Sequence, residues 1–199
     1  MPKETFNNLP IEKQKLIFNA CIKEFSAFPY SQASINQIIK NAGISRGSFY
    51  QYFEDKWDAY EMMMGRIAQE KMSLLPPPSL KNHFFDVMEQ FFHDTMEWIK
   101  LKPDYFQIGI LIDYDYDELI VKLREVNKGR LVFLEDMIRA DQSNNLIDPS
   151  VNPSDLVDMI TEVSKSALLK AYRSSDFEEM EKIFITRLHI IKKGVQVHV

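Results

Sequence analysis

The chain has 199 residues, 45% hydrophobic and 27% charged, which is enough apolar content to bury a sizeable core in one or two domains. Only six glycines and nine prolines occur, so an all-helical fold is favoured over a turn-rich sheet protein. With no long apolar run and no charged-then-apolar leader, neither a membrane span nor a signal peptide is supported, and we expect a cytoplasmic protein.

The net charge of −5 is divided unevenly along the chain. Residues 1–56 carry seven Lys and Arg against five Asp and Glu, a balance of +2, whereas the remainder carries seventeen against twenty-four, a balance of −7. This division predicts that nucleic acid, if it is bound, contacts only the N-terminal segment. In the same segment the single cysteine, Cys21, has apolar neighbours, and we expect it to be a buried small residue.

Residues 34–53 predict two short helices joined by a tight turn. Ser34 and Gln37 are three residues apart, as in a capping box, and predict a helix that starts at Ser34. Gly43 can take the positive φ of a helix C-cap, and Ser45 is a candidate N-cap for the second helix. This arrangement is typical of a helix-turn-helix.

The second of these helices would bury Phe49 and Phe53 on one face and expose a polar face opposite. The polar face consists of Arg46, Ser48, Tyr50, Gln51 and Tyr52. Arginine donates in a fork to guanine, glutamine pairs with adenine, and hydroxyls hold phosphates, so this face suits nucleic acid. The alternative, which any one of these residues alone would favour, is a helical hairpin with an ordinary polar exterior.

The conjunction of these residues resembles the signature of TetR-type transcriptional regulators. The matching stretch is Gly43-Ile44-Ser45-Arg46-Gly47-Ser48-Phe49-Tyr50-Gln51-Tyr52-Phe53, followed by Asp55-Lys56. The resemblance covers roughly fifty residues at the N-terminus. It implies an all-α fold with an N-terminal three-helix helix-turn-helix DNA-binding domain and a larger C-terminal helical ligand-binding and dimerisation domain.

The resemblance also implies roles for single residues. Base edges would be faced by Arg46, Gly47 and Gln51. The sugar-phosphate backbone would be held by Ser48, Tyr50, Tyr52 and Lys56. The DNA-binding surface would be completed by Ser34, Asn36 and Ser45.

The sequence departs from the family's pattern at Pro29, where glycine is usual, and at Ala33, where threonine is common. Proline cannot take a positive φ, so we expect the first helix to end before Phe28. These departures leave open an alternative function, a helical ligand-binding or protein-interaction module whose motif no longer binds DNA.

Beyond residue 53 the pattern is a series of helices. Asp55 is a plausible N-cap for a helix towards Met72, and three prolines at 76–78 stop it. We therefore predict a helix-turn-helix domain over 1–53, a connecting helix and proline linker over 54–78, and an effector-binding and dimerisation domain over 79–199. That last domain would open with a largely buried helix over 79–100.

The acidic stretch 113–118 follows a segment that begins at Pro103. A metal site at Asp113, Asp115 and Asp117 would make the protein an enzyme, but the stretch lacks the spacing of a calcium loop. A solvated turn before the next helix is favoured. That helix should run to about Arg139, with a polar connection over 141–149.

The last two helices are predicted to start at Asn152-Pro153 and near Asp176, and the second to end at 192–194. The resemblance implies a homodimer formed through these two helices. Their small residues are explained equally well by burial within one chain.

A small apolar effector would bind in the middle of the chain, among aromatic and Met side chains with a few polar tips. The candidates are Phe84, Met88, Phe91, Phe92, His93, Tyr105, Tyr114 and Phe133. No catalytic motif is present and the four histidines lack metal-binding spacing, so we expect no enzyme, no cofactor and no metal. The resemblance predicts a repressor released by its effector from a palindromic operator in double-stranded DNA.

Overall fold

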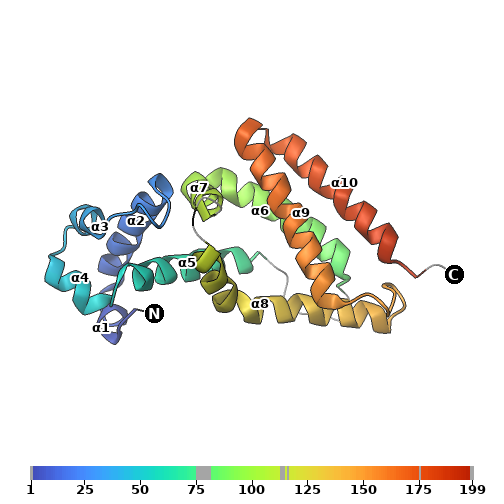
Figure 1. Ribbon diagram of the computed structural model, residues 1–199, viewed down its shortest axis with the longest axis horizontal. Coiled ribbons are helices and arrows are strands. Elements are labelled where there is room, and N and C mark those ends of the chain that lie inside the picture. The colour runs from blue at the N-terminus through green and yellow to red at the C-terminus, as the bar shows by residue number, and fades with distance from the viewer. Residues whose placement is uncertain (1, 75–81, 113–114, 116, 175, 198–199) are drawn as a thin grey trace. The chain divides into compact units, whose positions relative to one another are not determined.

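The computed structural model describes residues 2–74, 82–112, 115, 117–174 and 176–197, and these residues form ten helices and no strand (Figure 1). The helices are α1 (Glu4–Asn7), α2 (Ile11–Ala27), α3 (Ile35–Ala42), α4 (Arg46–Tyr52), α5 (Lys56–Met72), α6 (Phe84–Leu101), α7 (Pro103–Leu111), α8 (Asp117–Ser143), α9 (Pro153–Ser174) and α10 (Phe177–Val195). The predicted all-α class is confirmed. Within the described ranges, no helix is both long and apolar enough to span a bilayer.

The chain divides into two compact units. Unit 1 comprises Met1–Ser73 and Leu101–Ile120, and unit 2 comprises Leu74–Lys100 and Val121–Val199. Unit 1 therefore holds α1 to α5 together with α7, and unit 2 holds α6, most of α8, α9 and α10. The predicted proline linker at 76–78 lies outside the described residues.

Local capping determines where several helices begin and end. Ser45, Asp55 and Asp176 each accept a hydrogen bond from the backbone N–H three residues ahead, at 2.9–3.0 Å. The caps predicted at Ser45 and Asp55 and the helix start predicted near Asp176 are thus confirmed. Gly43 has a φ of +63° and closes α3 in the left-handed conformation, as predicted. The first long helix ends at Ala27, before Phe28, also as predicted.

The predicted capping box at the start of α3 is wrong. Ser34 is the N-cap residue, but its side chain accepts no capping hydrogen bond. Its backbone N–H donates to Oε1 of the buried Glu24 at 2.7 Å, while Gln37 donates to Asn41 at 3.2 Å. The donor that a capping box would satisfy is satisfied by a carboxylate of α2 instead, so Gln37 is not needed there.

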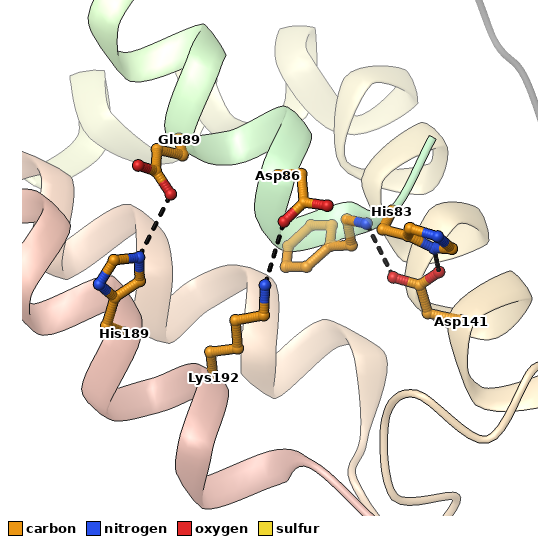
Figure 2. Close-up of polar contacts among 7 residues, drawn as sticks. His83, Asp86, Glu89, Asp141, His189 and Lys192 are labelled. Carbon is orange, nitrogen blue, oxygen red and sulfur yellow. Dashed lines mark hydrogen bonds and ion pairs between the residues drawn. The ribbon is translucent and has the colours of Figure 1, made fainter. Parts of the chain in front are cut away.

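The polar connection predicted to start at Asp141 starts later, because α8 extends to Ser143. Asp141 is 3% exposed, and its Oδ2 accepts the backbone N–H of Phe84 at 2.7 Å. Its Oδ1 lies 3.1 Å from Nδ1 of His83 (Figure 2). Asp141 thus caps the start of α6 from another helix, which explains a buried carboxylate near the end of α8.

In unit 2, α6 and α10 are joined by both apolar and polar contacts. Phe92 and Phe184 stack with ring centroids 3.7 Å apart. Polar pairs also cross between the two helices: His189–Glu89 at 3.3 Å and Lys192–Asp86 at 3.0 Å (Figure 2). A third pair, His93–Glu181, has a separation of 2.6 Å. Helix α9 packs beside α10 (Figure 1).

The His93–Glu181 pair makes the stability of unit 2 depend on pH. The hydrogen bond to Glu181 raises the pKa of His93 above its usual 6.5, so the folded state holds this proton more tightly than the unfolded state. The stabilisation is therefore fully present below about pH 6.5 and lost as the pH rises through the raised pKa. We expect Glu181→Gln to lower the free energy of unfolding at pH 5.5 and to match wild type at pH 9, as measured by urea unfolding. A destabilisation of equal size at both pH values would contradict this.

Candidate nucleic-acid interface

Helices α3 and α4 are anchored in unit 1 by their apolar faces. Ile38 of α3 and Phe49 of α4 are fully buried, as is Phe53 just after α4. Phe53 packs against both Phe49 and Phe6, with ring centroids 5.2 and 5.1 Å apart. Because one face of each helix is fixed in the core, the opposite faces are held in place at the surface.

Polar side chains on the exposed faces of α3 and α4 interact with one another. Nη1 of Arg46 donates to Oδ1 of Asn36 at 3.3 Å, and the guanidinium lies 5.8 Å from the centre of the Tyr50 ring. The hydroxyls of Ser45 and Ser48 are 2.9 Å apart. Arginine and tyrosine are thus gathered on one surface, oriented by neighbours on both helices.

Most of the predicted DNA-binding residues lie at the surface. The exposed ones are Ser34, Asn36, Ser45, Arg46, Gly47, Tyr50 and Gln51, while Ser48 and Lys56 are half-buried and Tyr52 is buried. Their contacts with DNA stay predictions.

Tyr52 belongs to the core of unit 1. Its side chain is 6% exposed, and its ring packs edge-on against Phe6 with centroids 6.3 Å apart. On its other flank, the Lys13 ammonium lies 5.7 Å from the ring centre. These contacts give Tyr52 a structural role, separate from the phosphate contact predicted for it.

Lys56 ties the loop between α2 and α3 to the start of α5. Its Nζ donates to the carbonyl oxygens of Tyr30 at 2.6 Å, Ser31 at 3.3 Å and Ala33 at 3.0 Å. An ammonium group has three donors, so a phosphate contact would require one of these bonds to be given up. Burial lowers the pKa of Lys56, and the nearby carboxylates of Asp115 and Glu24 oppose that shift.

Asp115 holds the same loop from the other side. Its two carboxylate oxygens accept the backbone N–H groups of Tyr30 at 2.6 Å and Ser31 at 2.9 Å. The prediction of a solvated turn is therefore wrong for Asp115, whose carboxylate binds the loop backbone. Asp113, Tyr114 and residue 116 lie outside the described residues. Among the residues that are described, no cluster of three or more His, Cys, Asp or Glu could hold a metal ion.

The predicted effector residues are distributed over both units. Phe84, Met88 and Phe92 are buried in unit 2, and Phe91 and Phe133 are half-buried there. His93 is exposed and paired with Glu181. Tyr105 belongs to unit 1, where its ring meets Phe18 edge-on at 6.4 Å, and Tyr114 lies outside the described residues. Their contact with an effector stays a prediction.

Helices α3 and α4 are joined at Gly43, whose backbone takes the left-handed conformation, and α4 exposes Arg46, Tyr50 and Gln51. This arrangement defines a helix-turn-helix DNA-binding protein. Residues 17–58 match the family model described as bacterial regulatory proteins, tetR family. These residues therefore form a TetR-type DNA-binding segment, which confirms the predicted resemblance and supports a DNA-binding transcriptional regulator over the alternative module.

Known proteins resemble the chain over most of its length. It is 22% identical to the uncharacterised HTH-type transcriptional regulator YdgC of Bacillus subtilis (strain 168), over 94% of this chain and 97% of YdgC. A TetR family regulator from Chloroflexus aurantiacus J-10-FL has a TM-score of 0.65 at 23% identity, with all of both chains covered. FadR from Bacillus subtilis, solved with stearoyl-CoA, has a TM-score of 0.74 at 16% identity, with 92% of this chain and 100% of FadR covered. The two structures show that the fold is shared.

Gly47 allows DNA binding and folding to be separated in one substitution. A Cβ added at Gly47 would meet only the Ser45 hydroxyl, at 3.7 Å, so alanine fits the free protein. We expect Gly47→Ala to leave the fold intact and to raise its stability by ~0.5–1 kcal/mol, because alanine favours a helix. If the helix backbone lies against DNA here, the added methyl group should weaken specific binding at least about tenfold, or ~1.4 kcal/mol.

Thermal unfolding and DNA titration of the Gly47→Ala variant would check both halves of this expectation. Gly65→Ala, a substitution in α5 with equally open space around the new methyl group, is the matched control and should leave binding unchanged. Unchanged DNA affinity in Gly47→Ala would show that this backbone does not approach the groove.

Proposed function

We propose that this regulator is a homodimeric repressor that binds a palindromic operator through α3 and α4 and is released by a small-molecule effector. The observation that carries the DNA-binding part is the exposed Arg46–Tyr50–Gln51 face on a helix whose opposite side is buried. Arg46 would donate to guanine, Gln51 would pair with adenine, and Tyr50 would hold a phosphate. Two such faces related by a two-fold axis would contact successive major grooves.

Homodimerisation through α9 and α10 is supported by apolar side chains left at their surface. Met159 of α9 is 54% exposed and Ile190 of α10 is 66% exposed, although both are large and apolar. Ala167, a small residue that could have favoured close packing of two chains, is already buried within its own chain. The proposed interface therefore rests on the larger exposed residues.

An effector site in unit 2 is supported by one buried hydroxyl. Oγ1 of Thr95 in α6 has no hydrogen-bond partner among the described residues, and the residue is only 4% exposed. A buried hydroxyl without a partner is costly and calls for an explanation. A mostly apolar effector with one polar group would provide that partner. To reverse a 99:1 preference for the DNA-binding state, it must bind the released state about ten-thousand-fold more tightly.

A regulator of this kind carries out its function by binding and needs no catalysis. The proposal accordingly includes no enzymatic step, no metal and no cofactor. Because the proposed partner is operator DNA, the proposed place of action is the cytoplasm. DNA binding is also what separates this proposal from a protein-interaction module with the same fold.

DNA from upstream of the protein's own gene tests the proposal. We expect wild type to bind it more tightly than scrambled DNA, with affinity falling steeply as salt rises, by about 0.9 log units per log unit of salt for each phosphate contacted. Arg46→Ala with Tyr50→Ala should weaken specific binding at least about tenfold, since one arginine–guanine pair is worth ~1–3 kcal/mol.

Arg139→Ala is the control for that experiment, because Arg139 lies at the surface of unit 2 and pairs with Glu135 and Asp136. It should leave the affinity for DNA unchanged. Sedimentation equilibrium should show the same dimer for all the proteins compared. A folded dimer that binds no DNA would contradict the proposal, whereas salt-sensitive binding without sequence preference would place the operator elsewhere.

A further inference from the structure

The C-terminal end of α4 requires hydrogen-bond donors from outside the helix. With seven residues, α4 has fewer than two turns, too short to be stable by its own hydrogen bonds. The last carbonyl groups of any helix lack partners within it. Within α4, the carbonyl of Phe49 accepts the N–H of Phe53, but the carbonyls of Tyr50, Gln51 and Tyr52 point beyond the helix end.

All three of these carbonyls are bound by residues near the N-terminus of the chain. The backbone N–H of Lys3 donates to the carbonyl of Tyr52 at 2.8 Å, and Nζ of Lys3 donates to that of Tyr50 at 3.0 Å. The hydroxyl of Thr5 donates to the carbonyl of Gln51. A cation at a helix C-terminus also complements the negative end of the helix dipole.

This contact is fixed by packing as well as by hydrogen bonds. Phe6 of α1 is fully buried and its ring contacts those of Tyr52 and Phe53, while the Arg66 guanidinium lies 5.5 Å from its ring centre. Lys3 is further held by an ion pair with Glu54 at 2.8 Å. Helix α1 thus packs directly on α4. The family match covers residues 17–58, so α1 lies outside it.

We propose that Lys3 and Thr5 are positioning residues for DNA binding, which hold α4 in its binding orientation by capping its C-terminal carbonyls. The proposal rests on the proposed DNA-binding function. The side chains of Tyr50 and Gln51 are predicted to contact DNA, while their carbonyls are held by Lys3 and Thr5. A change at Lys3 or Thr5 would therefore shift DNA contacts without touching DNA.

The first test measures the affinity of Lys3→Met with Thr5→Val for the upstream DNA over a range of salt. These substitutions remove the ammonium and hydroxyl donors but keep the backbone bond of Lys3 and the approximate shape of both side chains. We expect specific affinity to fall about tenfold, from two lost hydrogen bonds. The slope of log affinity against log salt should stay that of wild type, because no phosphate contact is lost.

Conservative and matched variants separate positioning from other roles. Lys3→Arg and Thr5→Ser keep the donors and should restore the affinity for DNA. Lys15→Met removes another exposed lysine of unit 1, which pairs with Glu12 and should have no effect on DNA binding. A slope that is shallower by about 0.9 in Lys3→Met would make Lys3 a phosphate contact and overturn the proposal. Unchanged affinity in the double variant would also overturn it.

A second test needs no DNA and so stands if the proposed function fails. In the free protein, hydrogen exchange of the amides at 49–53, in α4 and its C-cap, should speed up about tenfold in the double variant relative to wild type, while the amides of α10 keep their rates. Unchanged exchange in α4 would overturn the positioning role. Faster exchange in α4 together with a wild type that binds no DNA would uphold the capping contact and reject only the DNA-binding function.

Discussion

The arrangement of α3 and α4 depends on how the loop between α2 and α3 is held. The ammonium of Lys56 binds three carbonyls of this loop, and Asp115 binds two of its N–H groups. The carboxylate of Glu24 accepts the backbone N–H of Ser34, the residue that precedes α3. Backbone groups that a short irregular loop leaves unpaired are thus satisfied by charged side chains, which fixes the entry into α3.

Both ends of the two-helix motif are therefore fixed by residues that contact its backbone. The loop network holds the start of α3, and Lys3 with Thr5 holds the end of α4. Between them, Gly43 sets the turn and Phe49 anchors the buried side. The polar side chains predicted to bind DNA extend from a backbone that protein groups hold at the start of α3 and at the end of α4, so these side chains are pre-organised for a ligand.

Features determined by neighbouring residues could be predicted from the sequence. The caps at Ser45, Asp55 and Asp176, the glycine at the end of α3 and the end of α2 before Phe28 all follow from residues within a few positions. The buried Cys21, whose pKa burial raises to about 12, follows from its apolar neighbours. The short helix α1 was not predicted, because it is stabilised by contacts with α4, 46 and 47 residues away.

Contacts between residues far apart in sequence could not be predicted. Glu24 caps Ser34 ten residues away, Asp141 caps Phe84 at a separation of 57, and Asp115 reaches Tyr30 at a separation of 85. Each of these carboxylates resembles an ordinary surface residue in the sequence, and only the fold gives it a partner. The same limit applies to Lys56, whose predicted partner was phosphate and whose partners in the structure are carbonyls.

We propose that Arg46 on α4 contacts base edges in the major groove of an operator. Methylation protection tests it most directly, because dimethyl sulfate modifies guanine N7, the atom that an arginine fork would bind. We expect protected guanines in two half-sites about one helical turn apart, and we expect that protection to be lost in Arg46→Ala under conditions where the variant still occupies the DNA. Tight, sequence-specific binding that leaves every guanine N7 as reactive as in free DNA would contradict it.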